Sequence, residues 1–388
     1  MSWDTIELKE AVSILSGYAF KSSLFNSEGN GLQIIRIRDV VRGYSNTFFD
    51  GSFNEKYLIR NGDYLIGMDG EFNIAPWKNG EALLNQRVCK IDKVNEDIID
   101  KKYLAYFLGL KLKKIEDLTP YVTVKHLSVK TINAIKIPLP PLAEQKRIAA
   151  ILDKADALRT KRRQAIAKLD ALLQATFLDM FGDPVTNPMG WDTVPMKDII
   201  VDGPQNGLYR HASDYGSGIP IIRIDSFYSG KVIGLEKLKR LRLDSKTQER
   251  YAVNEGDILI NRVNSREYLG KTAIVPSLLE PTVFESNMMK FTVDDKKLMP
   301  QYLVSLMQHE YIKMQIMGRC KDAVNQSSIN QSDVKSFELR IPPLETQRKY
   351  ISIAKKIEVM RKVLLQNNSK LDTLFHALQQ QAFRGQLS

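Results

Sequence analysis

The sequence is poor in cysteine, because Cys89 and Cys320 are its only two thiols and they lie far apart. This spacing excludes a disulfide framework and a CxxC zinc finger, and it favours a reducing compartment. Long apolar runs are also missing, and none approaches the roughly 18–20 residues of a membrane span. Residues 1–7 have neither the basic nor the apolar region of a secretory signal. We therefore expect a cytoplasmic protein without a membrane partner.

Catalytic and metal-binding motifs are equally scarce. The Asn/Asp-Pro-Pro-Tyr/Phe string of adenine-amino methyltransferases does not occur. Gly270-Lys271-Thr272 resembles the end of a P-loop, but Ser265 occupies the position of its first glycine. Asp69-Gly70-Glu71 lacks the nearby lysine of a metal-dependent nuclease, so a turn or a base contact is favoured there. The four histidines have no partners at zinc-ligand spacing, and they are His126, His211, His309 and His376. We expect no catalytic residue, metal or cofactor in this chain.

The composition favours a folded, basic protein. Charged residues make up 26% and apolar residues 43% of the 388 positions, which is typical of globular domains. The chain has 56 Lys and Arg against 45 Asp and Glu, a net charge of +11. This excess favours a polyanionic partner, most simply nucleic acid, although a basic enzyme without such a partner is the alternative.

The sequence repeats itself once. Trp3-Asp4-Thr5 recurs as Trp191-Asp192-Thr193, and Ile34–Ile37 recurs as Ile221–Ile224. From Pro140 to Phe181 each residue aligns with one 202 positions later without a gap, and roughly a third of these pairs are identical. Such a long period excludes a solenoid and predicts two tandem half-molecules.

Each half begins with a mixed segment, 1–139 or 183–341. Gly, Asn and Asp turn signals separate short β-rich runs, and helical stretches lie between them. This pattern predicts a compact α+β globule in each half. The predicted strands include Leu32–Ile37, Tyr64–Ile66, Ile219–Ile224 and Asp257–Ile260, and the predicted helices include Lys102–Ile115 and Pro300–Met317.

Each half ends with one long predicted helix, 141–181 or 343–384. Pro141 and Pro343 suit the first helical position, and no Gly or Pro follows before Gly182 and Gly385. Because one amphipathic rod cannot bury its own apolar stripe, we expect the two helices to pack as an antiparallel coiled coil. The alternative is that each helix lies on its own globule. The expected fold class is α+β, with two α/β globules in tandem repeat separated by these helices. The predicted seam residues are Ile151, Ala155, Leu158, Ala165, Leu169 and Leu172, then Ile353, Ile357, Met360, Leu364, Leu371, Leu374 and Leu378, interrupted by Arg162 and Asn367.

Two similar basic globules on paired helices predict two separate contacts with one DNA duplex. Their shared scaffold and different loops indicate two different half-sites, so the expected target is bipartite and asymmetric.

Residues 137–148, Ile-Pro-Leu-Pro-Pro-Leu-Ala-Glu-Gln-Lys-Arg-Ile, resemble the signature that follows each target-recognition domain in specificity (S) subunits of Type I restriction–modification systems. Residues 341–348 carry a weaker version, in which Thr346 replaces the expected Glu. The Ile-Arg-Ile and Gly-Asp-Tyr/Ile-Leu-Ile strands resemble the family as well, and the resemblance covers essentially the whole chain. It implies recognition domain 1 at 1–140, a spacer helix at 141–182, recognition domain 2 at 183–341 and a C-terminal helix at 342–388.

The resemblance implies a non-catalytic subunit that selects the DNA sequence. It would bind double-stranded DNA and two methyltransferase (M) subunits through its helices, and two restriction (R) subunits can join such a complex. The partners, not this chain, would use S-adenosylmethionine, and ATP with Mg. Four alternatives remain open: a stand-alone sequence-specific DNA-binding protein, a structural coiled-coil protein, an S subunit whose partner fuses methyltransferase and nuclease, and a fused Type II enzyme.

The candidate DNA contacts are polar side chains on loops near predicted strand ends, because base edges are read there by Arg, Asn and Gln. Each has the alternative of an ordinary solvated surface residue. The pair Arg36 and Arg223 recurs in both halves and is therefore assigned to phosphate or scaffold, while Met68–Lys78 and Arg262–Lys271 are favoured for specificity. The first half supplies Lys21, Arg36, Arg38, Asn73, Lys78, Gln86, Arg87, Lys125 and His126, and the second supplies Tyr209, Arg210, Arg223, Arg262, Asn264, Arg266, Lys271, Asn287, Asn325 and Gln326.

The candidate partner contacts lie on the long helices, where the resemblance implies that M subunits dock. The basic cluster 159–163 would face spacer phosphates or acidic groups of M, or it forms a solvated helix face. The residues assigned to partner binding are Gln145, Arg147, Arg159, Arg162, Gln347, Arg348 and Arg361.

Overall fold

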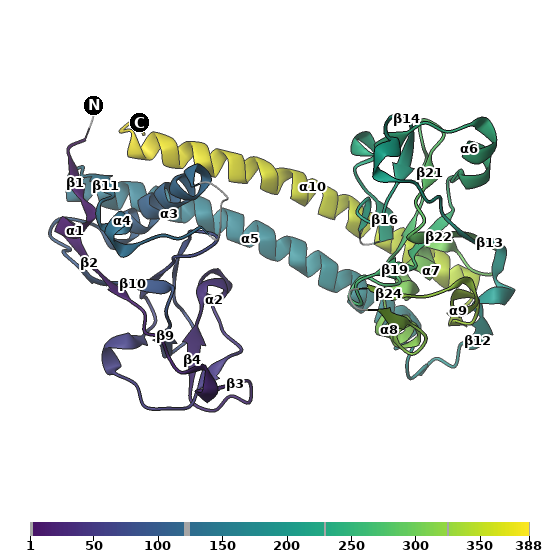
Figure 1. Cartoon of the computed structure of the whole chain (residues 1–388), viewed down its shortest axis with the longest axis horizontal. Helices are drawn as coiled ribbons and strands as arrows, with labels where there is room; N and C mark the ends of the chain where they lie inside the picture. The colour runs from purple at the N-terminus through teal and green to yellow at the C-terminus, as the bar shows by residue number, and fades with distance from the viewer. Residues whose placement is uncertain (1–2, 120–124, 229, 324–325, 388) are drawn as a thin grey trace. The chain divides into compact units, whose positions relative to one another are not determined.

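The computed structural model divides into two compact units (Figure 1). Unit 1 comprises residues 1–165 and 364–388, and unit 2 comprises residues 166–363. The long helices α5 (Leu142–Phe181) and α10 (Leu344–Phe383) each contribute one part to either unit. The structure describes residues 3–119, 125–228, 230–323 and 326–387.

In unit 1, the beginning of the chain is paired with the end of the globule. Strand β1 (Thr5–Glu7) runs antiparallel to β11 (Lys136–Pro138). A second sheet has the order β2-β10-β7-β8, and a third has the order β3-β5-β4-β9-β6 with β4 and β9 parallel. The bounds are β2 Val12–Ser16, β3 Phe25–Asn26, β4 Leu32–Ile35, β5 Phe48–Phe49, β6 Leu58–Ile59, β7 Tyr64–Gly67, β8 Ile74–Pro76, β9 Ala82–Leu84 and β10 Val88–Val94.

The main core of unit 1 joins this globule to both long helices. Helix α3 begins where the Asp100 carboxylate accepts the backbone N–H groups of Lys102 and Tyr103, and its apolar face is buried. The same core contains Leu152 of α5 and Phe375 of α10. The helices of the globule are α1 (Leu8–Ala11), α2 (Ile37–Arg42), α3 (Lys101–Leu118) and α4 (Val129–Asn133).

Unit 2 repeats the plan with additional strands. Strand β12 (Asp192–Pro195) is antiparallel to β25 (Glu338–Ile341), as β1 is to β11. The other sheets have the orders β13-β22-β18-β20-β16-β15, β17-β14-β21 and β19-β24-β23. The strand bounds are β13 Ile200–Asn206, β14 Tyr215–Ile222, β15 Phe227–Tyr228, β16 Gly230–Val232, β17 Lys239–Leu241, β18 Ile258–Asn261, β19 Val263–Asn264, β20 Thr272–Ile274, β21 Val283–Phe284, β22 Met288–Val293, β23 Lys321–Ala323 and β24 Gln326–Ser328, and the helices are α6 Ser245–Tyr251, α7 Pro300–Met307, α8 Glu310–Met317 and α9 Gln331–Lys335.

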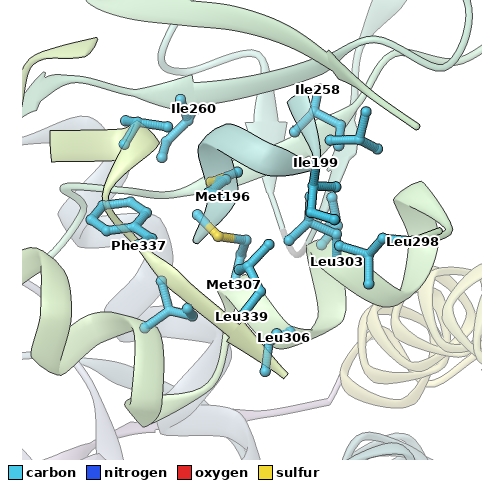
Figure 2. Packing of buried hydrophobic residues seen from close by; sticks show 14 of the residues in the cluster. Met196, Ile199, Ile258, Ile260, Leu298, Leu303, Leu306, Met307, Phe337 and Leu339 are labelled. Carbon is cyan, nitrogen blue, oxygen red and sulfur yellow. The ribbon is translucent and has the colours of Figure 1, made fainter. Parts of the chain in front are cut away.

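The core of unit 2 lies between its large sheet and helices α7 and α8. Figure 2 shows Ile258 and Ile260 of β18 in the same cluster as Leu303 and Met307 of α7. Phe177 of α5 belongs to this cluster too, so the helix is anchored by apolar burial as well as by its chain connection.

The expected fold class is confirmed, and several predicted boundaries are corrected. The strand expected over Leu32–Ile37 ends at Ile35, because the Asp39 carboxylate accepts the backbone N–H of Arg36 (3.1 Å) and starts α2. The helix expected over Pro300–Met317 is two helices, because His309 caps the second one. Pro141 and Pro343 precede the first helical residue, and their carbonyl oxygens accept the first-turn N–H groups.

Within each unit, the parts of the two long helices run antiparallel. In unit 1, Arg159 of α5 bonds Asp372 of α10 (2.7 Å), while Arg147 reaches the carbonyl oxygen of Leu387 (3.0 Å). In unit 2, Arg361 bonds Asp170 (2.7 Å). The two arginine–aspartate pairs occupy corresponding positions of the repeat, because Arg361 lies 202 residues after Arg159 and Asp372 lies 202 residues after Asp170.

Five of the thirteen apolar residues predicted for the seam are exposed, so the buried line along these helices differs there from the predicted heptads. Leu158 and Met360 are exposed, at 58% and 57%, whereas the next residues, Arg159 and Arg361, turn inward. The Arg159 guanidinium stacks on the Phe375 ring at 4.2 Å. Leu172, Ile353 and Leu374 were also expected in the seam but are exposed. In each case the next residue of the helix is the less exposed one.

The two arginine–aspartate pairs are expected to stabilise their own units. Arg159 and Asp372 have side chains 13% and 32% exposed, so their attraction is only partly screened by solvent. Alanine at each position and at both should give a coupling free energy of about 0.5–2 kcal/mol in thermal unfolding. Burial acts to raise the pKa of Asp372, but hydrogen bonding and charge from Arg159, with Arg163, lower it overall. The stabilisation is therefore present above the ordinary Asp pKa and is lost as the pH falls through the lowered one.

The matched cycle is Arg361→Ala with Asp170→Ala, which tests the pair of unit 2. If the single substitutions lowered the free energy of unfolding by strictly additive amounts in both cycles at neutral pH, a stabilising role for these pairs would be contradicted.

Candidate nucleic-acid interface

Three segments of unit 1 meet at the ends of strands β7 and β10. The N–H of Met68 donates to the carbonyl oxygen of Arg87 (3.0 Å), and the N–H of Leu127 donates to the carbonyl oxygen of Met68 (2.7 Å). We call the segments 68–73, 85–87 and 125–127 loop cluster 1. Their convergence brings Asp69, Arg87 and His126 together, although they are far apart in the sequence.

The side chains of loop cluster 1 form a charged group. The Asp69 carboxylate lies 2.5 Å from Nδ1 of His126 and 3.5 Å from Nε of Arg87. The side chains of Arg87 and His126 are 55% and 49% exposed, whereas that of Asp69 is 17% exposed. Arg87 also has φ 70°, a left-handed conformation that favours glycine. An exposed arginine held in this conformation marks a candidate contact site.

Unit 2 builds the corresponding group with the same backbone bonds. The N–H of Arg262 donates to the carbonyl oxygen of Asn287 (2.8 Å), and the N–H of Ile329 donates to that of Arg262 (2.9 Å). Strands β19 and β24 continue this pairing. We call the segments 262–266, 285–287 and 326–329 loop cluster 2.

The side chains of loop cluster 2 differ from those of cluster 1. Arg266 is exposed and lies 3.3 Å from the exposed Asp322 carboxylate. Arg262 turns inward, where its Nη1 donates to the carbonyl oxygen of Ser286 (3.1 Å). Its buried Nε has no hydrogen-bond partner among the described residues. Arg266 is therefore the better placed of the two for a contact outside the protein.

The two segments favoured from the sequence are not simple loops. Residues 74–76 form β8, which pairs back along β7, so Lys78 lies at the opposite end of that hairpin from Asp69. Asn73 belongs to loop cluster 1, and its amide donates to the Glu71 carbonyl oxygen. In unit 2, Lys271 returns beside Asn261, and its ammonium lies over the rings of Phe227 and Tyr268. Burial lowers the pKa of Lys271.

The repeated arginines Arg36 and Arg223 are held by contacts within their units. Arg36 donates to Oγ1 of Thr47 (2.5 Å) and lies 3.5 Å from the buried Asp39 carboxylate. Arg223 donates to Glu285 (3.1 Å), whose other oxygen accepts a backbone N–H. These contacts give both guanidinium groups a scaffold role, which was one of the two roles expected.

The remaining candidates fall into exposed and buried groups. Tyr209 is 74% exposed, and Arg210 donates to its carbonyl oxygen. Lys125 is buried, and its ammonium donates to the Glu116 carbonyl oxygen (2.5 Å), so the direct DNA contact expected of it is replaced by a structural one. Asn325 lies outside the described residues. Lys21, Arg38, Gln86 and Gln326 are exposed, while Asn264 and Asn287 are half-buried in loop cluster 2.

Gln145 and Gln347 occupy fully buried positions and make the same bonds in both units. Each Oε1 accepts a backbone N–H at the start of a helix, from Asp100 or Met299 (2.8 Å both). Each Nε2 donates to two carbonyl oxygens, one of them that of Pro140 or Pro342. The direct partner contact expected of these amides is therefore replaced by an internal joint between long helix and globule.

The arginines assigned to partner binding differ in accessibility. Arg159 and Arg361 are engaged by the aspartates described above, and Arg162 is half-buried. Arg147 is bound to Glu144 (2.7 Å) but remains exposed, as does Arg348. These contacts do not test binding to a partner, so the assignments of all five arginines stay predictions.

Several residues that shape the clusters had no signal of their own in the sequence. Asp322, Glu285 and Glu116 are distant in the sequence from the residues that they hold, which are Arg266, Arg223 and Phe72, so only the fold joins them. In the described ranges, no group of three or more histidine, cysteine or acidic side chains is arranged to hold a metal ion. Nor does any described helix combine the length and apolar character that crossing a membrane requires.

The fold is a tandem repeat in which two related units carry equivalent loop clusters. The family model of the Type I restriction modification DNA specificity domain matches residues 1–169 and 188–371, and the chain belongs to this family.

Curated relatives and solved structures agree with this assignment. The chain is 28% identical over 417 residues to the Type I restriction enzyme EcoBI specificity subunit of Escherichia coli, covering 100% of this chain and 86% of the relative. It is 24% identical to the StySPI specificity subunit of Salmonella potsdam, covering 100% and 89%. The crystal structure of a Type I S subunit from M. genitalium matches with a TM-score of 0.55 at 14% identity, covering 98% and 96%, which shows the shared fold.

Proposed function

We propose that this chain is the DNA sequence-specificity subunit of a Type I restriction–modification complex, in which each unit reads one half of an asymmetric bipartite site. The observation that carries this proposal is the repeated loop cluster. Equivalent backbone bonds assemble it in both units, but Asp69, Arg87 and His126 occupy one copy and Arg266 with Asn287 the other. A common scaffold with different donors and acceptors suits two different half-sites.

The chain itself is proposed to be non-catalytic and to assemble with two M subunits, and with two R subunits for restriction. The partners supply the S-adenosylmethionine, ATP and Mg chemistry. Large apolar side chains exposed on the long helices support docking there, since Leu158, Met360 and Leu374 are 58%, 57% and 64% exposed. The same side chains disfavour a stand-alone DNA-binding protein, which would have no reason to expose them.

The proposal is tested by comparing the host methylome with the gene intact and deleted, while the tagged chain is purified from the intact strain. We expect one gapped, asymmetric adenine-methylation motif to disappear on deletion and a methyltransferase to copurify. An unchanged methylome together with the absence of a copurifying methyltransferase would refute the proposal.

A further inference from the structure

The Asp69–His126 contact fixes which nitrogen of the imidazole carries its proton. Nδ1 lies 2.5 Å from a carboxylate oxygen of Asp69, which can only accept hydrogen bonds when it is ionised. A bare Nδ1 lone pair at this distance would repel the carboxylate, so Nδ1 must be the protonated nitrogen. The neutral ring is therefore a hydrogen-bond acceptor at Nε2.

Arg87 reinforces this arrangement. Its Nη1 lies 3.3 Å from the same Nδ1 of His126, and its Nε lies 3.5 Å from Asp69. Because both Nη1 and Nδ1 carry hydrogens, their contact is a close approach and not a hydrogen bond. The guanidinium instead lies beside the Asp69 carboxylate as a group of opposite charge. No described residue is a partner of His126 Nε2, and the ring is about half exposed.

We propose that Asp69 is a positioning residue for base recognition in the first half-site, because it sets the tautomer of His126 so that Nε2 accepts a hydrogen bond from a base amino group. This inference rests on the proposed function. In the major groove, amino donors are presented by cytosine N4 and adenine N6, whereas guanine and thymine present acceptors at the matching positions. Loop cluster 1 therefore offers an acceptor at His126 beside the guanidinium donors of Arg87, which suit guanine.

The acceptor of His126 and the donors of Arg87 together specify two neighbouring bases, and at the His126 position they select a class of base and not a single one. His126 selects cytosine or adenine and discriminates against guanine and thymine, and Arg87 selects guanine at a neighbouring position. Without the ionised Asp69, both tautomers of His126 are accessible, and the same ring then accepts or donates at Nε2. Discrimination at the His126 position should fall, while that at the Arg87 position should largely remain.

The test uses the complete complex with its methyltransferase and a DNA library that is randomised over both half-sites. We expect Asp69→Asn to lower the preference for amino-bearing bases at one position of the first half-site by about 5- to 30-fold, the loss of part of one good base contact. His126→Ala should lose the same preference, and Asp69→Asn should add nothing further in that background. If the effect of Asp69→Asn depends on His126, Asp69 acts by positioning His126 and not merely by supporting the local structure. The control is Glu81→Gln, an exposed carboxylate of unit 1 that pairs with Arg60 outside loop cluster 1, which should leave every first-half preference unchanged.

Two outcomes would overturn the inference. The first is an unchanged first-half preference in Asp69→Asn while the methylation motif still depends on the chain. The second is an equal loss of preference by Asp69→Asn with and without His126. Both outcomes leave the proposed function intact. If no gapped methylation motif depended on the chain, the proposed function itself would be refuted.

Discussion

Gln145→Leu is expected to destabilise unit 1 by about 2–5 kcal/mol, because it leaves several buried polar groups without partners. The amide satisfies the N–H of Asp100 and the carbonyl oxygens of Ile98 and Pro140, at 2.8–3.0 Å. Leucine has a similar size but no polar atoms. Asp100 also caps α3, so the start of that helix should loosen together with the joint to α5.

Hydrogen–deuterium exchange of α3 reports this effect locally, which matters because a chain with two units need not unfold in one step. Faster exchange in α3 is expected for Gln145→Leu, and Gln347→Leu should act on α7 in the same way. Gln164→Leu replaces an exposed glutamine of the same helix and provides the control. Equal exchange in the variants at positions 145 and 164 would show that the buried amide is dispensable.

Arg266→Ala is expected to relax one base position of the second half-site by about 5- to 150-fold, the equivalent of about 1–3 kcal/mol for a bidentate guanine contact. Arg266 is 62% exposed, and its partner Asp322 is 53% exposed. Such a surface pair contributes little on its own, so the guanidinium can exchange the carboxylate for guanine O6 and N7 at small cost. Arg262 differs, because its bond to Ser286 makes it part of the support for the cluster.

Methylation of a degenerate-site library by the variant complex measures this relaxation at each base. Arg242→Ala removes another exposed arginine of unit 2, one that donates to Ser217, and should leave base preference unaltered. An Arg266→Ala complex with the parental preference at every position would remove Arg266 from the reading surface.

The tandem architecture could be predicted because it depends on local and repeated signals. The α+β segments and the two uninterrupted helices follow from turn residues, periodicity and the gapless offset between the copies. Boundaries were less predictable where a side chain decided them. The end of β4 depends on whether the Asp39 carboxylate accepts the Arg36 N–H and starts a helix, and strand periodicity does not register that bond.

The helix seam shows why apolar periodicity alone was insufficient. Heptad reasoning selected Leu158 and Met360 because they are apolar, but the protein turns Arg159 and Arg361 inward. An arginine can lie along an apolar surface through its stem while its guanidinium reaches an aspartate of the other helix. The preference for Arg159 also depends on Phe375, which lies over two hundred residues away in the chain.

The candidate site was predicted in part. Arg87, His126, Arg262, Arg266 and Asn287 were named individually, and the fold brings them into the two clusters. The burial of Lys125, Gln145 and Gln347 was not predictable. The identity of a polar residue in a motif does not show whether its side chain binds a partner or makes hydrogen bonds inside the protein. Their acceptors and donors are backbone groups, which a sequence does not distinguish.

The two thiols differ in a way that gives the second recognition unit its own chemical reporter. Cys89 is fully buried in the core of unit 1, and burial raises its pKa to about 12, so it stays a thiol that electrophiles do not reach. Cys320 is only half-buried, and its Sγ lies 4.0 Å from the Asp322 carboxylate that faces Arg266. We therefore expect a maleimide added to the native chain to modify Cys320, which lies beside the Asp322 partner of Arg266, in preference to Cys89. If loop cluster 2 contacts DNA as proposed, the rate of this modification should fall when DNA is bound, and no engineered label is needed to measure it.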